Sequence, residues 1–313
     1  MSVFKGLIIF IVAIGILALL GVIVLYGYHR IKLNSETLQA QGEMVKVNDH
    51  YMHAFVSGEG EHTFVFLSGH GTPSPVVDFK PLWEPLSQQA KIIVIERPGY
   101  GFSQPVNTAR NVESILEETK TVLNELNIEG PYVLIPHSMA GLEAMLWAAL
   151  YPEEVEAIIG LEAITPSYVL NTLELPSKVS LRAMAFISRI GLSRFMSDED
   201  RVQMMPILKH PMLDEQDQAV FLYNFYKQSY SKPVMNEIEF LKQNAKTVQE
   251  NLNNFDMPIL MISESSNHEY IESINEFNKK YPFSEQMIFD GTHYIHHDNG
   301  GQIIDAIWSL LDN

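Results

Sequence analysis

The sequence predicts an α/β domain on a mostly parallel, doubly wound sheet, with a helical insertion and an apolar helix before it. Short apolar segments alternate with helix-forming segments from residue 62 to residue 161, an order typical of a parallel sheet covered on both faces. Residues 167–234 are rich in Met and aromatic residues and have helical patterns, with no obvious strand. Residues 7–26 carry no charge.

Composition narrows the class of protein. The chain has 313 residues, enough for one large α/β domain with an insertion. Lys and Arg number 21 against 38 Asp and Glu, a net charge of −17. Such an acidic surface repels phosphate backbones and anionic lipid headgroups, so we expect no nucleic-acid partner. The sequence has no cysteine, which excludes disulfides, a thiol nucleophile and Cys-ligated zinc but decides no compartment.

The uncharged run Leu7–Tyr26 is long enough to cross about 30 Å of hydrocarbon as a helix. Lys5 precedes it, and Arg30 and Lys32 follow it, as interfacial anchors would. A signal peptide has a shorter apolar run and a cleavage site between small residues. We therefore expect a single-pass membrane anchor. The flanking charges nearly balance, and the expectation that the domain lies on the extracytoplasmic side is drawn from them.

The remaining elements are predicted from apolar periodicity. Residues 44–56 alternate on either side of Asn48-Asp49, which indicates a hairpin. Further strands are predicted at 62–67, 91–95, 132–135, 156–161, 258–262 and 285–289, and helices at 79–89, 112–126, 143–150, 269–279 and 301–311. The chain is thereby divided into a tail (1–6), an anchor (7–28), a tether (29–42), a core (43–166 and 235–313) and a helical cap (167–234).

Ser138 lies where a strand turns directly into a helix. The apolar run Tyr132–Ile135 precedes it, and the helix-forming run Glu143–Leu150 follows. Pro136 and Ala140 occupy the positions two residues before and after it. So sharp a turn strains the central residue and exposes its hydroxyl above the sheet, as in a nucleophile elbow. The alternative is a serine that only caps the helix.

These segments resemble the α/β-hydrolase superfamily. Five motifs carry the resemblance in the family's order: Leu67–Thr72, Glu96–Ser103, Pro136–Gly141, Tyr151–Val155 and Gly291–Asp298. The resemblance covers almost everything from Gly42 to Asn313. It implies hydrolysis by a Ser–His–acid triad in the chain order Ser, acid, His. Dehalogenases and epoxide hydrolases of this fold attack with Asp, so a serine here implies acyl transfer to water.

Ser138 needs a general base, and His293 is best placed because it follows the last predicted strand. His296 and His297 come next, and we expect them to face solvent, to pack, or to support the site. The spacing of His293, His296 and Asp298 would also allow a metal site. A serine elbow needs no metal, so we expect neither a metal nor a cofactor.

The acid departs from the commonest pattern of the family. The loop after the penultimate strand, where most members have Asp, has Asn267. A neutral amide cannot stabilise an imidazolium by charge. Glu162 directly follows the strand after the elbow helix, at the sheet edge expected for Ser138. This placement is similar to that in some haloalkane dehalogenases. We predict Glu162 as the acid, with Glu264 and Glu269 in reserve. The alternative is that Glu162 only caps the first turn of the lid.

The oxyanion hole is predicted to use the backbone N–H groups of Met139 and His70. The His70 side chain could instead face the substrate. The substrate is expected to be a small molecule, an ester with an apolar acyl or aromatic group. Apolar cap side chains would receive that group or pack on the sheet: Met184, Phe186, Ile187, Ile190, Phe195, Phe221, Tyr223 and Phe225.

The prediction is therefore a membrane-anchored carboxylesterase-type hydrolase with a Ser138–His293–Glu162 triad. Two alternatives stay open. One is a membrane-tethered sensor that binds a ligand with little turnover, suggested by Asn267. The other is a cofactor-free perhydrolase or haloperoxidase, which resembles serine esterases in its triad.

Overall fold

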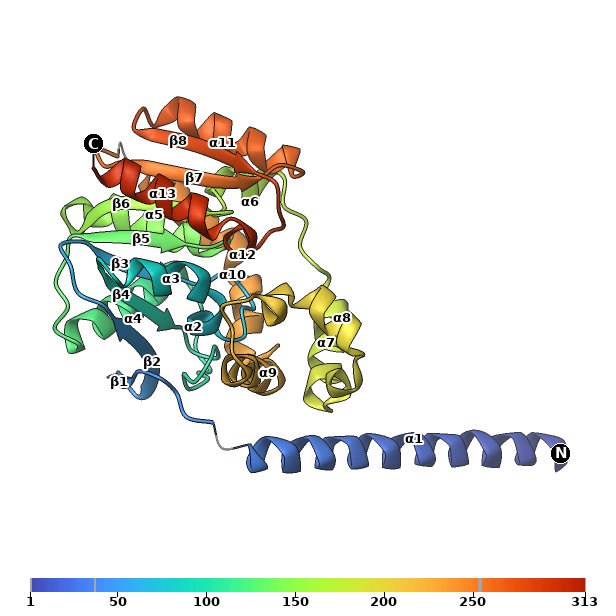
Figure 1. The fold of residues 1–313 in the computed structure, drawn as a ribbon. Coiled ribbons are helices and arrows are strands. Elements are labelled where there is room, and N and C mark those ends of the chain that lie inside the picture. Colours follow the sequence, from blue (N-terminus) through green and yellow to red (C-terminus); the bar gives the residue numbers. More distant parts are fainter. Residues whose placement is uncertain (1, 37, 253–254, 313) are drawn as a thin grey trace.

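An eight-stranded sheet organises the computed structural model of the chain, which describes residues 2–36, 38–252 and 255–312 (Figure 1). The strand order is β1-β2-β4-β3-β5-β6-β7-β8. The sheet is parallel from β4 to β8, whereas β1 and β2 pair antiparallel. The strands are β1 (Glu43–Val47), β2 (His50–Ser57), β3 (Thr63–Leu67), β4 (Lys91–Glu96), β5 (Tyr132–Pro136), β6 (Val155–Leu161), β7 (Ile259–Glu264) and β8 (Ser284–Phe289).

The central strands are buried along their whole length. Every residue of β3 and of β5 is buried, as expected for parallel strands covered on both faces. The strand predictions therefore agree with the structure to within two residues at either end. The predicted hairpin at Asn48-Asp49 is also confirmed, since β1 and β2 pair across it.

Helices cover both faces of the sheet (Figure 1). One face packs against α3 and α13, and the other packs against α4, α5, α10 and α11. Outside the insertion, the helices are α2 (Pro75–Asp78), α3 (Lys80–Leu86), α4 (Val112–Glu125), α5 (Ala140–Leu150), α11 (His268–Lys280), α12 (Ile295–Asp298) and α13 (Gly300–Leu311). The two short helices α2 and α12 were not predicted.

The segment between β6 and β7 is helical, and α7, α8 and α9 lie beyond the carboxyl ends of the strands (Figure 1). We call residues 167–234 the cap. The helices of the insertion are α6 (Pro166–Asn171), α7 (Lys178–Arg189), α8 (Asp198–Met204), α9 (Glu215–Gln228) and α10 (Lys232–Asn251). Helix α10 begins in the cap and continues without a break into the core, where Leu241, Ala245 and Val248 are buried.

The N-terminal helix α1 (Ser2–Ser35) extends away from the domain (Figure 1). Within the described residues, Phe4–Ser35 is the one helix long and apolar enough to cross a membrane. Residues 29–35, predicted to belong to the tether, continue this helix. Contacts with the cap account for the difference, because His29 and Leu33 are buried there.

Candidate active site

Ser138 occupies the turn between β5 and α5. Its φ is +51°, a left-handed conformation that is uncommon for a residue with a side chain. Its N–H donates to the Leu161 carbonyl (3.1 Å), and its carbonyl accepts from the N–H groups of Gly141 (3.0 Å) and Ile164 (2.9 Å). A Cβ at position 141 would lie 2.6 Å from the Ile164 oxygen, so the turn requires glycine there.

The structure brings Ser138, His293 and Glu162 together. Ser138 Oγ lies 3.0 Å from His293 Nε2, and His293 Nδ1 lies 3.4 Å from Glu162 Oε2. Glu162 directly follows β6, and His293 lies in the loop between β8 and α12. All three residues thus stand at the carboxyl edge of the sheet, the edge at which ligands bind in open α/β folds.

The two partners of the imidazole differ in exposure. The His293 side chain is 50 % exposed, whereas that of Glu162 is 2 % exposed. Glu162 has a φ of +48°, and its second carboxylate oxygen accepts from the Glu264 N–H (2.6 Å). The carboxylate is therefore fixed between a backbone amide and His293, while the far side of the imidazole is open.

The reserve acids have other partners. Asn267 caps α11, and its side-chain oxygen accepts from the Tyr270 N–H (3.1 Å). The Glu264 carboxylate accepts from the N–H (2.8 Å) and hydroxyl (2.9 Å) of Ser266. Glu269 is exposed on α11. Within the described part of the chain, none of these three side chains contacts His293.

The turn Ser68–Thr72 packs directly against the elbow. A Cβ on Gly69 would lie 3.0 Å from Ser138 Cβ and 2.6 Å from His137 Nδ1, so only glycine allows this approach. Arg97 donates to the carbonyl of Ser68 (2.7 Å). These contacts hold the turn beside the Ser138 hydroxyl.

Tyr100 supports the same turn. It accepts from the Gly71 N–H (3.0 Å) and donates to the buried Glu237 carboxylate (2.5 Å). Burial, together with that carboxylate, raises the pKa of Tyr100 above its usual value, so the hydroxyl stays protonated. Across the described residues, the backbone N–H groups of Met139 and His70 donate no hydrogen bond. They are free to face a ligand.

The His70 side chain is not directed at Ser138. Its Nε2 lies 2.9 Å from the Val234 carbonyl of α10, and burial lowers the pKa of this imidazole. A neutral ring can donate Nε2–H to that carbonyl. His70 thus joins the turn to the first residues of α10.

His296 and His297 flank the buried carboxylate of Asp78. Their Nε2 atoms lie 3.0 and 3.1 Å from its two oxygens. Burial alone would raise the pKa of Asp78, but the charge of His297 and the two imidazole hydrogen bonds hold it below its usual range. Burial and the neighbouring His297 lower the pKa of His296 to about 4.

The metal trio considered from sequence does not form. His296 pairs with Asp78, and Asp298 is exposed. Asp78, His296 and His297 instead offer ligand atoms within 4.8 Å of one another. A cation could bind these atoms only by replacing both hydrogen bonds of the carboxylate, so the trio is better explained as a buried hydrogen-bonded network. Within the described residues, the Nδ1 atoms of His296 and His297 are buried without a hydrogen-bond partner.

His137 links this network to the triad. It is 1 % exposed, and its Nε2 lies 3.0 Å from the His293 carbonyl. Burial and the nearby His293 lower the pKa of His137 well below its usual value, so the ring is neutral and donates to that carbonyl. The imidazole of His137 therefore fixes the backbone of the base.

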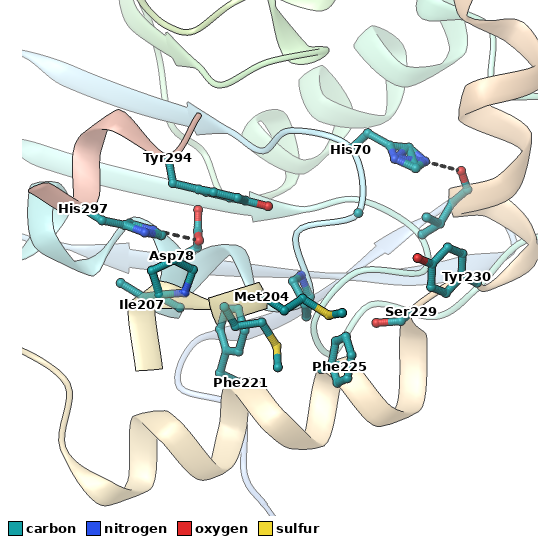
Figure 2. Close-up of a pocket in the computed structure, with 15 residues that line it drawn as sticks. His70, Asp78, Met204, Ile207, Phe221, Phe225, Ser229, Tyr230, Tyr294 and His297 are labelled. Atoms are coloured by element: carbon teal, nitrogen blue, oxygen red, sulfur yellow. Dashed lines mark hydrogen bonds and ion pairs between the residues drawn. The ribbon is translucent and has the colours of Figure 1, made fainter. Parts of the chain in front are cut away.

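A cavity of about 250 Å³ lies between the core and the cap (Figure 2). Its walls include Phe221 and Phe225 of α9 on one side and Tyr294, His297 and His70 on the other. Ser138 and His293 are not among its lining residues. The cavity thus lies beside the triad, and Tyr294, the residue after His293, is part of its wall.

The prediction of apolar cap residues holds in part. Phe221 and Phe225 face the cavity (Figure 2). Ile190 is buried, and Tyr223 stacks with Phe102 outside the cavity lining. Four of the predicted side chains are exposed on the outer surface: Met184, Phe186, Ile187 and Phe195. The apolar composition of α7 is visible in the sequence, whereas the direction of its apolar face depends on how the helix packs.

Sequence reasoning missed the residues that support the site. Asp78, Arg97 and His137 are each buried beside it. Arg97 belongs to the motif Glu96–Ser103. Two adjacent histidines, His296 and His297, are a signal that a carboxylate could lie nearby. Asp78 lies more than two hundred residues away from them in the chain, so no local pattern joined the three.

The family model of the alpha/beta hydrolase fold matches residues 63–300. The chain belongs to the α/β-hydrolase family. It is 31 % identical over 240 residues to the uncharacterized protein YbdG of Bacillus subtilis, covering 76 % of this chain and 73 % of that protein. A shorter match, 24 % identical over 115 residues, is to a cis-3-alkyl-4-alkyloxetan-2-one decarboxylase of Shewanella oneidensis, covering 36 % of this chain and 35 % of the decarboxylase.

Solved structures with the same fold include an epoxide hydrolase from Bacillus megaterium (TM-score 0.64, 15 % identity, 87 % of this chain and 100 % of that chain). A haloalkane dehalogenase DbeA variant from Bradyrhizobium elkanii gives a TM-score of 0.62 at 15 % identity (86 % and 95 %). An N-formylmaleamic acid deformylase from Pseudomonas putida S16 gives 0.64 at 17 % identity (85 % and 100 %). At these identities, the likeness shows the fold, and the family shows a hydrolase.

Proposed function

We propose that the chain is a membrane-anchored serine hydrolase of carboxylic esters, with Ser138 as nucleophile, His293 as general base and Glu162 as acid. The observation that carries the proposal is the 3.0 Å contact between Ser138 Oγ and His293 Nε2. It occurs at a strained elbow, with a buried carboxylate on the other imidazole nitrogen. Nucleophile, base and orienting acid in contact are the signature of an activated serine.

In the proposed reaction, His293 takes the Ser138 proton as the oxygen attacks the ester carbonyl. The tetrahedral oxyanion accepts from the free N–H groups of Met139 and His70. His293 then protonates the leaving alcohol, which leaves an acyl-enzyme. Water, deprotonated by His293, attacks the acyl carbonyl, and the returned proton regenerates the serine as the acid departs. Glu162 stabilises the imidazolium in both halves.

The serine favours esters over the alkyl substrates named for some structural neighbours. Attack by a hydroxyl on a haloalkane or an epoxide would leave an ether, which has no carbonyl for water to attack. Attack on an ester leaves a second ester, which the same base can hydrolyse. The chemistry of Ser138 therefore supports acyl transfer.

The cavity supports a small apolar acyl or aromatic group. Phe221, Phe225, Met204 and Ile207 contribute apolar walls (Figure 2). Its volume of about 250 Å³ lies just below the usual range for ligand pockets, which suits a short chain or a single ring. We propose in addition that α1 is the membrane anchor and that the domain lies on the extracytoplasmic side.

The alternative of a binding module was suggested by the neutral Asn267 at the usual position of the acid. Asn267 acts as the N-cap of α11, so its being neutral no longer points to a disabled triad. A perhydrolase would use the same three residues and would differ by peroxide-dependent halide oxidation.

The test is reaction of the full chain in detergent with a fluorophosphonate probe and with short p-nitrophenyl esters. We expect covalent labelling and turnover, both lost in Ser138→Ala and both retained in the control Ser273→Ala on α11. Labelling that persists in Ser138→Ala would contradict the nucleophile. Labelling without turnover of any ester would favour the binding module.

A further inference from the structure

The C-terminal end of α1 is docked on the cap. Arg194 Nε lies 3.0 Å from His29 Nδ1, and its guanidinium lies 3.2 and 3.3 Å from the two oxygens of the Glu36 carboxylate. The same guanidinium lies 4.2 Å over the Tyr226 ring of α9. Because three contacts converge on one side chain, α1 leaves the domain at a fixed place beside α9.

A groove of about 560 Å³ lies between α1 and the cap. Among the described residues, its walls carry no carboxylate and have basic side chains from α1, α7, α9 and α10: Arg30, Arg182, Arg189, Lys227 and Lys232. The chain as a whole has a net charge of −17. A wall with cations alone is therefore unlike the rest of the molecule.

Four of these five cations lack an ionic partner within the described residues, and the fifth, Lys227, lies over the rings of Phe102 and Tyr223. Among the ion pairs of the described residues, none involves Arg30, Arg182, Arg189 or Lys232, and all four side chains are exposed. Clustered like charges repel one another, so the arrangement costs stability unless an anion enters the groove. The groove is thus suited to a negatively charged ligand.

Apolar side chains stand beside the cations. Val179 is 77 % exposed, Phe186 53 % and Phe195 60 %. Phe195 contacts the ring of Tyr28, with 6.1 Å between ring centroids. Tyr28 is the last residue of the predicted anchor. The exposed apolar side chain of Phe195 therefore lies next to the point at which α1 would leave a membrane. Basic and apolar side chains together are typical of a surface that lies in the lipid interface.

We propose that this groove binds the anionic headgroup of a phospholipid from the membrane that α1 enters, with Arg182, Arg189 and Arg30 contacting the phosphate. The proposal rests on the membrane anchoring of the proposed function. The headgroup supplies the missing negative charge, and the acyl chains remain in the bilayer beside Phe186 and Phe195.

The groove and the cavity beside the triad share a wall. Ser229 and Tyr230, at the junction of α9 and α10, line both. Tyr230 has a φ of +58°, a strained conformation for a tyrosine. A lipid in the groove therefore touches the same two residues that bound the substrate cavity.

The test compares phosphatidylglycerol with phosphatidylcholine for retention by the full chain in neutral detergent micelles, measured by native mass spectrometry. We expect about tenfold tighter retention of phosphatidylglycerol. The preference should fall to within about twofold in Arg182→Gln/Arg189→Gln, and should weaken in Arg30→Gln, which alters α1 instead of the cap. The control Lys246→Gln/Lys280→Gln removes the same charge from exposed, unpaired lysines of α10 and α11 and should keep it.

Equal retention of the two lipids would overturn the proposal, and so would an equal loss in the groove and control variants. Displacement of the lipid by millimolar glycerol phosphate would assign the groove to a free phosphate compound instead. Flotation on neutral phosphatidylcholine vesicles reports on α1 alone. Failure to float contradicts the anchor, whereas the micelle comparison contradicts the groove, so the two failures are distinguishable.

Discussion

Two assemblies of histidine and carboxylate side chains lie close together at the carboxyl edge of the sheet, and they differ in exposure to solvent. His293 is half exposed, with Glu162 on one nitrogen and Ser138 on the other. His296 is fully buried, and it shares the Asp78 carboxylate with His297. The first assembly offers a proton acceptor to a ligand. The second is closed around His296, and its Asp78 and His297 reach the wall of the cavity between core and cap.

The difference shows that burial decides what such a pair can do. A buried imidazole beside a carboxylate fixes two segments, because opening the pair would leave unpaired polar groups in the interior. An exposed imidazole with one buried partner keeps its orientation and can still exchange a proton. Replacing members of the two assemblies should therefore affect different quantities.

The largest expected effect is on the exposed assembly. His293→Ala should lower kcat for p-nitrophenyl esters by about 10⁵-fold, since Ser138 loses its base. Because the side chain is half exposed, the unfolding midpoint should change by less than about 2 °C. Steady-state kinetics and thermal unfolding of the same preparation check both. A large fall in the unfolding midpoint would show that His293, like the buried histidines, contributes to stability.

Glu162→Gln should lower kcat by about 10³- to 10⁴-fold, because the imidazolium loses its negative partner. The matched change Asn267→Asp should alter kcat by less than about twofold, since Asn267 caps α11 and Asp caps equally well. Both rates are measured with the same ester. Near-full activity in Glu162→Gln would show that another group orients His293.

The buried assembly should respond through stability. Asp78→Asn should lower the free energy of unfolding by about 4 kcal/mol, because it removes the charge that two buried imidazoles face. The remaining folded fraction should retain most of its kcat, since Asp78 does not contact the triad. Denaturant unfolding and probe-titrated active sites separate the two quantities. A loss of kcat in Asp78→Asn at unchanged stability would show that the buried assembly acts in catalysis and not in stability.

The smallest expected effect is on the stability of the protein at acidic pH. The folded-state pKa of His296 is lowered to about 4 from 6.5, so the unfolded chain binds more protons between these values. This contribution is fully present above pH 6.5 and is lost as the pH falls towards 4. His296→Gln should therefore reduce the stability difference between pH 6.5 and pH 5 by about 2 kcal/mol. Unfolding measured at both pH values tests this, and an unchanged difference would contradict it.

The sheet and the triad could be predicted from sequence because their signals are local. Apolar runs marked the strands, and Ser138, Glu162 and His293 each follow the end of a strand at one edge. Parallel strands bring such positions together without further information. The catalytic roles of these three residues remain predictions.

The supporting residues could not be predicted in the same way. Asp78 and His296 are joined only through the folded core, as are Tyr100 and Glu237. The outward direction of Phe186 depends on which face of α7 packs, and an amphipathic pattern alone does not state what covers either face. The end of α1 was likewise predicted by composition, whereas its contact with Arg194 extends the helix through Ser35.

If α1 is the membrane anchor proposed above, its docking on the cap has a kinetic consequence. An enzyme whose entrance is held at a fixed height above a bilayer meets substrates dissolved in that bilayer by lateral diffusion. Its rate then depends on their surface density, and diluting them with inert lipid slows turnover even at constant bulk concentration. By fixing α1 on the cap, Arg194 would favour substrates dissolved in the membrane over substrates in solution, although it does not contact the triad.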